Sequence, residues 1–230
     1  MTDYSYIKRN FYELNEELSS IAMAVGTEAP KLVCVTKSGT DEELLALADL
    51  GCTAIGENRP GELKRRGELL SLHSLFPELH QIGTLQSNKA KLVCDKAALI
   101  HSLDSISLAK EIDKQARKLG RKISVLIEIN SAEEPQKSGV LPGDAEKFLD
   151  AVLPFEYISV SGLMTMGPAV DDPEQLRKYF SLTKNLFDKL NARYGFGDTP
   201  TLSMGMSDSY KVAIEEGSTL VRVGRRLFIK

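Results

Sequence analysis

The sequence contains no tryptophan and only three cysteines and three histidines among its 230 residues. The cysteines, Cys34, Cys52 and Cys94, form no Cys-x-x-Cys pair, and the histidines do not lie at the spacing of metal ligands. An odd, scattered set of cysteines is typical of reduced thiols. We therefore expect a cytoplasmic protein with neither a disulfide framework nor a bound metal.

Long apolar runs and a strong excess of one charge are also missing. No stretch is long and apolar enough to span a bilayer, and the N-terminal segment is polar, so we expect no membrane partner and no signal peptide. The net charge is −3, with acidic residues interspersed among short basic clusters, which gives no sign of a nucleic-acid partner. What remains is an ordinary globular composition, 42% hydrophobic and 27% charged.

Apolar, strand-like runs alternate along the chain with amphipathic, helix-like stretches. The strand-like runs are LVCVT, TAIGE, LHQIGT, ALIHSLD, ISVLIEIN, YISVSGLMTM, TLSMGMS and TLVRVG. Strands of this kind between helices predict a parallel sheet covered by helices, and about eight strands favour a (β/α)8 barrel over an open sheet. No linker or low-complexity tract interrupts the pattern, so we expect a single domain over residues 1–230.

Helix signals add detail to this barrel. Residues 3–25 carry an apolar face at steps of three and four, which predicts an extra helix before the first strand. No helix follows the last strand, and we expect the extra helix to cover that gap. Ser107 is expected to begin a later helix and Gly120 to end it. Gln86 and Asn88 predict capping of a helix after the third strand, with contact to a ligand or partner as the alternative.

Lys37 closes the first apolar run, in KLVCVTKSGT. In a barrel the carboxyl ends of the strands form the active site, so this position is one where chemistry is expected. Burial there would favour the neutral amine, which is a nucleophile toward carbonyl groups. The alternative is a lysine that ends a strand and points into water.

The segment after the seventh strand, Ser203 to Ser207, reads SMGMS. Barrels often bind a phosphate with the loops after strands seven and eight. The segment supplies hydroxyl groups, a glycine that allows close approach, and a following helix whose N-terminal amides attract anions. Gly224 offers a second point of close approach. The alternative is a tight turn that uses small residues.

A nucleophilic lysine that faces a phosphate site is compatible with two chemistries. One is a Schiff-base aldolase acting on a phosphorylated sugar, and the other is binding of pyridoxal 5'-phosphate (PLP). Arg222, two residues before Gly224, would favour PLP if it faces the ring nitrogen, because a permanent cation there keeps the pyridine unprotonated. Alternatively, Arg222 pairs with a buried acid such as Glu57 or Glu128.

Several motifs occur in a specific order over nearly the whole length. They are VCVTK around Lys37, GEN at 56–58, HQIGTLQSNK at 80–89, KSG at 137–139, GLMTMG at 162–167, LSMGMSDS at 202–209 and AIEEGSTLVRVG at 213–224. Together they resemble the YggS/PROSC family of PLP homeostasis proteins. That resemblance implies a PLP fold type III barrel like that of alanine racemase.

The resemblance also implies site residues. Lys37 would carry PLP through an imine, Arg222 would lie near the ring nitrogen, and Asn58 and Met164 would line the cofactor. The phosphate would be surrounded by Ser203, Met204, Gly205, Ser207 and Gly224. Among other candidates, Lys89 and Lys137 would bind the cofactor loosely, and Tyr210 is expected to pack on a helix instead of acting as a base.

The function implied is intracellular vitamin B6 homeostasis, as a carrier or regulator without clear turnover and with PLP-dependent apo-enzymes as recipients. Racemases of this fold add a second domain that supplies an opposing tyrosine, and we expect no such domain here. Because only Lys37 can be named as a base, a PLP-dependent racemase or lyase is the alternative, followed by the aldolase. We expect a monomer, since no apolar stripe remains outside the barrel pattern.

Two positions depart from the family pattern. Gly61 stands where a glutamine commonly follows the GEN segment. The contact that this glutamine would make at the pocket rim is therefore not expected here. Ile229 replaces a glycine after the final GR-x-x-F, at the exit of the last strand.

Overall fold

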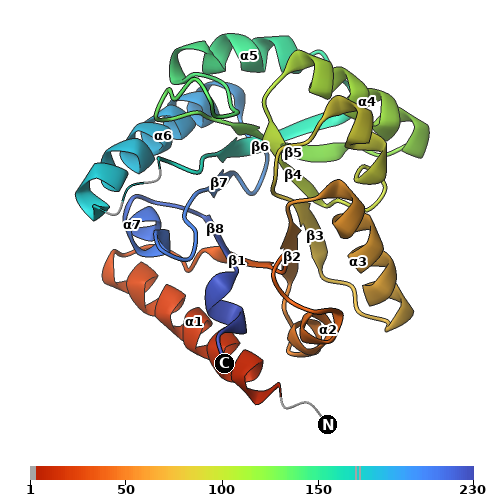
Figure 1. The fold of residues 1–230 in the computed structure, drawn as a ribbon. Helices are drawn as coiled ribbons and strands as arrows, with labels where there is room; N and C mark the ends of the chain where they lie inside the picture. Colours follow the sequence, from red (N-terminus) through yellow and green to blue (C-terminus); the bar gives the residue numbers. More distant parts are fainter. Residues whose placement is uncertain (1–3, 169, 171) are drawn as a thin grey trace.

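The structure, a computed structural model, describes residues 4–168, 170 and 172–230. Its strands pair in parallel, each with the next along the chain, and the last pairs with the first to close a barrel (Figure 1). The strands are β1 (Lys31–Val35), β2 (Ala54–Glu57), β3 (Glu78–Gln81), β4 (Leu99–Leu103), β5 (Ile123–Glu128), β6 (Ile158–Met164), β7 (Thr201–Ser203) and β8 (Leu220–Val223). Six lie within the predicted runs, and β1 and β3 each begin one residue before theirs, at Lys31 and Glu78.

Helices surround the barrel in Figure 1. The α-helices are α1 (Ser5–Ala24), α2 (Asp41–Asp49), α3 (Pro60–Leu72), α4 (Ile106–Leu119), α5 (Ala145–Val152), α6 (Pro173–Tyr194) and α7 (Tyr210–Glu215). Short 3-10 helices are η1 (Ser87–Leu92), η2 (Pro142–Asp144) and η3 (Arg225–Phe228). The predicted single-domain (β/α)8 barrel with an extra N-terminal helix is confirmed.

One local prediction is wrong. Ser105, not Ser107, caps α4: it is extended, with φ −149° and ψ 148°, and its hydroxyl accepts a hydrogen bond from the Leu108 N–H. The predicted helix after β3 is present, as the 3-10 helix η1. Its neighbouring buried residues Ala90 and Val93 are three positions apart, a spacing that suits the three residues per turn of a 3-10 helix. Gly120 ends α4, as predicted.

Helix α1 covers the gap left after β8, as the sequence predicts. It packs against α7, α2 and η3 (Figure 1). Its buried face includes Ile7, Leu14 and Leu18. The side-chain amide of Asn10 donates hydrogen bonds to the backbone carbonyls of Leu227 (3.2 Å) and Ile229 (2.7 Å). The beginning and the end of the chain are thereby held together.

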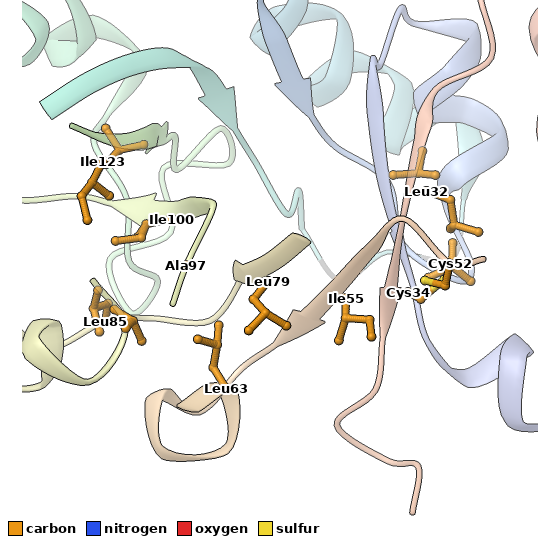
Figure 2. Packing of buried hydrophobic residues seen from close by; sticks show 14 of the residues in the cluster. Leu32, Cys34, Cys52, Ile55, Leu63, Leu79, Leu85, Ala97, Ile100 and Ile123 are labelled. Atoms are coloured by element: carbon orange, nitrogen blue, oxygen red, sulfur yellow. The ribbon is translucent and has the colours of Figure 1, made fainter. Parts of the chain in front are cut away.

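Side chains of each strand alternate between the helix layer and the barrel interior. Figure 2 shows part of the apolar layer between strands and helices, which contains Ile55, Leu79 and Ile100 from successive strands. A smaller apolar cluster consists only of strand residues and lies inside the barrel: Val33, Ala54, Leu99, Leu126, Met164 and Leu220. The same alternation directs several polar side chains, among them His80 and His101, into the interior.

Candidate functional site

A cavity of about 430 Å³ opens at the carboxyl ends of the strands. This is the end of a barrel at which active sites form. Its charged lining residues are Lys37, Glu128, Asp208, Arg222 and Arg225. The remaining lining comes from Val35, Ser38, Asn58, Ile82, Gly83, Thr84, Met166, Met206, Ser207 and Gly224.

Lys37 lies two residues beyond the end of β1, and its side chain is exposed. The predicted burial of its amine is therefore wrong. The turn that carries it is nevertheless fixed, because Arg66 of α3 donates to the carbonyl oxygens of Thr36 (2.5 Å) and Gly39 (2.7 Å), on either side of the lysine. Lys37 is thus an exposed side chain on a firmly held backbone.

Arg66 forms a buried ion pair with Glu57, at the end of β2, with an N–O distance of 2.8 Å. The same Glu57 oxygen accepts a hydrogen bond from the Thr36 hydroxyl (2.5 Å). This role of Arg66 was not predicted from the sequence. Arg66 falls on the buried stripe of α3, together with Leu63, Gly67 and Leu70, and a charge on an apolar stripe is the signal that points to it.

Arg222 is buried in the barrel interior, with 4% of its surface exposed. Its guanidinium donates to the Ser203 hydroxyl (2.5 Å) and to the Thr165 carbonyl oxygen (3.0 Å). Burial lowers the pKa of Arg222 to about 10, and the attraction of Glu128 opposes this shift. The alternative pairing of Arg222 with an acid is not observed, because within the described ranges no carboxylate lies within 4.0 Å of it.

Glu128, at the end of β5, is the second buried charged residue of the cavity, with 3% of its surface exposed. Its Oε2 atom has no hydrogen-bond partner among the residues that the structure describes. Burial and the neighbouring Asp104 raise the pKa of Glu128 to about 7, against the opposing effect of Arg222. From the sequence, Glu128 was predicted only as an alternative partner of Arg222, although a carboxylate at the end of the apolar run ISVLIE indicates a site residue.

Two glycines shape the end of the cavity near β7 and β8. Gly205 has φ +95°, and a Cβ atom there would lie 2.6 Å from the Ala213 Cβ, so the turn requires glycine. A Cβ atom on Gly224 would lie 2.8 Å from the Val35 carbonyl oxygen. In the described part of the chain, the backbone N–H groups of Ser207 and Asp208 have no hydrogen-bond partner. These two groups are suited to bind an anion.

Five of the predicted site residues line the cavity: Lys37, Asn58, Ser207, Arg222 and Gly224. The other four, Met164, Ser203, Met204 and Gly205, are buried and do not line it. Met164 belongs to the apolar cluster inside the barrel, and Met204 faces the helix layer because it follows Ser203 in the alternation. The Ser203 hydroxyl accepts a hydrogen bond from Arg222, which does line the cavity.

The remaining candidates do not line this cavity. Gln86 precedes η1 but makes no capping hydrogen bond, so its predicted capping role is wrong. Together with Gly61 and Lys89 it lines a neighbouring hollow, in which a Cβ atom on Gly61 would meet nothing within 4 Å. Lys137 pairs with Glu134 at 2.7 Å. The Tyr210 hydroxyl accepts from Arg226, away from the cavity.

A closed parallel barrel with a lysine, a buried arginine and a turn with two unpaired N–H groups at one end defines a class, the barrels of the alanine racemase type. The model of the family "Alanine racemase, N-terminal domain" matches residues 10–229. The chain belongs to this family and, within it, to the pyridoxal phosphate homeostasis proteins. It is 40% identical over 203 residues, 88% of each chain, to the pyridoxal phosphate homeostasis protein of Aquifex aeolicus.

Solved structures agree with this assignment. A protein of unknown function from Bifidobacterium adolescentis has a TM-score of 0.91 and 32% identity, with 99% of this chain and 98% of that chain covered. PipY from Synechococcus elongatus, in a structure with PLP bound, has a TM-score of 0.84 and 26% identity, with 97% and 100% covered. Within residues 4–168, 170 and 172–230, no helix is both long and apolar enough to cross a membrane.

Proposed function

We propose that the protein binds PLP through an imine between the cofactor aldehyde and the Lys37 amine, with residues 1–230 acting as one PLP-binding domain. The observation that carries the proposal is that Lys37, the buried Arg222 and the unpaired N–H groups of the β7–α7 turn face one cavity. The relative PipY, whose structure contains PLP, supports the choice of cofactor.

The residues present fit PLP group by group. The turn at Ser207 and Asp208, next to Gly224, would hold the phosphate through backbone N–H groups. Arg222 would face the ring nitrogen. Bound PLP supplies an aldehyde for imine formation and a ring that withdraws electrons. A cation at the ring nitrogen disfavours protonation there and weakens that withdrawal, so Arg222 favours holding the cofactor over turnover.

We infer a carrier or regulator role in intracellular vitamin B6 homeostasis, because relatives such as that of Aquifex aeolicus are named for PLP homeostasis. The exposed position of Lys37 supports this role, since an accessible imine can be attacked by an incoming amine and the cofactor released. PLP-dependent apo-enzymes in the cytoplasm would be the recipients, and the protein would act as a monomer.

The Lys37→Ala variant tests the anchor. We expect it to lose the visible absorbance of the imine and to keep the circular dichroism spectrum of the fold, because an exposed side chain contributes little to the core. Lys89→Ala and Lys137→Ala are matched controls and should keep the absorbance. Full imine absorbance in Lys37→Ala would mean that another lysine forms the imine, and would contradict the proposal.

A second candidate, a PLP-dependent racemase or lyase, is favoured by one observation. Glu128 places a carboxyl group with a pKa of about 7 in the same cavity as Lys37. Racemisation requires two groups that exchange protons on opposite faces of the substrate. Incubation of the PLP-loaded protein with L- and D-amino acids in D2O distinguishes the candidates: a carrier leaves the Cα proton in place, whereas a racemase exchanges it for deuterium.

A further inference from the structure

A line of hydrogen bonds runs through the barrel interior, away from the cavity. It connects Arg222 Nη1 to Ser203 Oγ (2.5 Å), Ser203 Oγ to His101 Nδ1 (3.0 Å), His101 Nε2 to His80 Nδ1 (2.9 Å) and His80 Nε2 to Glu78 Oε2 (3.0 Å). The three middle residues are at most 1% exposed. Glu78, the first residue of β3, is half exposed at the opposite end of the strands.

The two ends of this line determine the direction of every bond in it. The Arg222 guanidinium can only donate. Glu78 is a carboxylate, because the hydrogen bond from His80 and the ammonium of Lys31 at 2.6 Å lower its pKa to about 2, so it can only accept. Burial lowers the pKa of both His80 and His101, which keeps the imidazoles neutral.

With neutral imidazoles only one arrangement satisfies all four bonds. Ser203 donates to Nδ1 of His101, Nε2–H of His101 donates to Nδ1 of His80, and Nε2–H of His80 donates to Glu78. The opposite tautomers would direct a lone pair of His80 at the Glu78 carboxylate. A second proton on His101 would place a charge in the barrel interior, where burial and the neighbouring Arg222 disfavour it.

We propose that His101, supported by His80, is a positioning residue for Arg222. The four hydrogen bonds that connect Arg222 to the Glu78 carboxylate, with every donor directed toward Glu78, are called the relay below. The relay takes the place of the carboxylate partner that Arg222 lacks in the described part of the structure. A hydroxyl group that donates a hydrogen bond becomes a stronger acceptor itself, because the bonds of a chain polarise one another. Ser203 therefore binds the guanidinium more strongly than it would without His101. The consequence for cofactor binding rests on the proposed function.

The relay itself is tested without cofactor, by nitrogen-15 NMR of histidine-labelled protein at pH 7. We expect His80 and His101 to be neutral, with the proton on Nε2 and Nδ1 unprotonated. Ser203→Ala should shift the nitrogen resonances of His101 and also those of His80, one residue further along the relay. A proton on Nδ1 of His101 in the unmodified protein, or unchanged His80 resonances in Ser203→Ala, would overturn the proposal.

The positioning role is tested with three histidine variants. His101→Leu removes the acceptor of Ser203 and should weaken PLP affinity about ten-fold, the size expected for one unpaired buried polar group. It should also shift the absorbance maximum of the bound cofactor. His101→Gln, which keeps one donor and one acceptor, should recover most of the affinity. His73→Leu is the control, because His73 is exposed at the end of α3.

Equal affinity and equal spectra in His101→Leu and His73→Leu would refute the positioning role. If His101→Leu fails to fold, as judged by circular dichroism, the NMR experiment on Ser203→Ala decides whether the relay connects Ser203 to both histidines. The two tests also separate the proposals: the NMR result stands even if PLP does not bind at Lys37, and loss of the imine in Lys37→Ala stands even if the relay is disproved.

Discussion

At the scale of single residues, the charges of the cavity differ in how they are held. Lys37 is exposed, whereas Arg222 and Glu128 are buried without an ion pair to each other. An exposed amine is accessible to a cofactor or a competing amine, and buried charges are held in a constant orientation. The exposed Lys37 is therefore the group that we expect to react, and the buried Arg222 and Glu128 are those that we expect to position a ligand.

Glu128 provides a prediction about stability and pH. Its pKa is raised from 4.5 to about 7 in the folded protein, so between these values the native state keeps a proton that the unfolded chain has lost. This stabilisation is fully present below about pH 4.5 and is lost as pH rises through 7. Relative to Glu128→Gln, the free energy of unfolding should therefore fall by on the order of 3 kcal/mol between pH 4.5 and 7.5.

Urea denaturation at both pH values measures this difference. Glu68→Gln is the control, because the Glu68 side chain is 54% exposed and should leave the pH dependence unchanged. Identical pH dependence in the unmodified protein and Glu128→Gln would mean that the carboxyl group ionises normally.

At the scale of elements, α3 and β2 together fix the turn after β1. Arg66 from α3 and Glu57 from β2 form the buried pair, and the pair holds the backbone on both sides of Lys37. Removing one partner of such a pair leaves an uncompensated buried charge. The position of Lys37 thus depends on a helix from which, among the described residues, no charged side chain lines the cavity.

Arg66→Met should lower the free energy of unfolding by about 3–5 kcal/mol, because Glu57 would remain buried without its partner. Arg65→Met, one position earlier on the same helix, should cost less than about 1 kcal/mol, because the Arg65 side chain is 46% exposed in its ion pair with Asp41. Chemical denaturation measures both. A similar cost for the two variants would show that the buried pair does not stabilise the fold.

The sequence predicts the elements well and the contacts between distant elements poorly. The β1 run around Cys34 and the β5 run around Val125 are recognisable because burial on both faces leaves a continuous apolar pattern. Lys37 and Arg222 could be placed because strand ends of a barrel meet at one end. Arg66 and His101 could not, since their roles depend on partners from other elements, such as Thr36 for Arg66 and Ser203 for His101, which only the closed barrel brings together.

At the scale of the whole molecule, α1 completes the ring of helices next to β8. The side chain of Asn10 bridges 217 and 219 positions of sequence to reach the carbonyl oxygens of Leu227 and Ile229. The departure at Ile229 does not disturb this contact, because it involves the backbone and the Ile229 side chain is exposed. The contact joins both ends of the chain close to Arg225, which lines the cavity.

Asn10→Ala should lower the free energy of unfolding by about 1–3 kcal/mol, because buried carbonyl groups lose their donor. Amide hydrogen exchange should also become faster in η3. Asn15→Ala is the matched control on the same helix, since the Asn15 amide bonds only within α1, to the Phe11 carbonyl oxygen. Equal exchange rates in η3 for both variants would mean that Asn10 does not hold the end of the chain.

The central claim is that Lys37 anchors the cofactor, and the most direct measurement is borohydride reduction of the PLP-loaded protein followed by peptide mapping. Reduction converts an imine into a stable secondary amine at the lysine that formed it. The account predicts loss of the visible band and a pyridoxyl group on the peptide that contains Lys37. A label on another lysine, or a protein that stays colourless with added PLP, would contradict it.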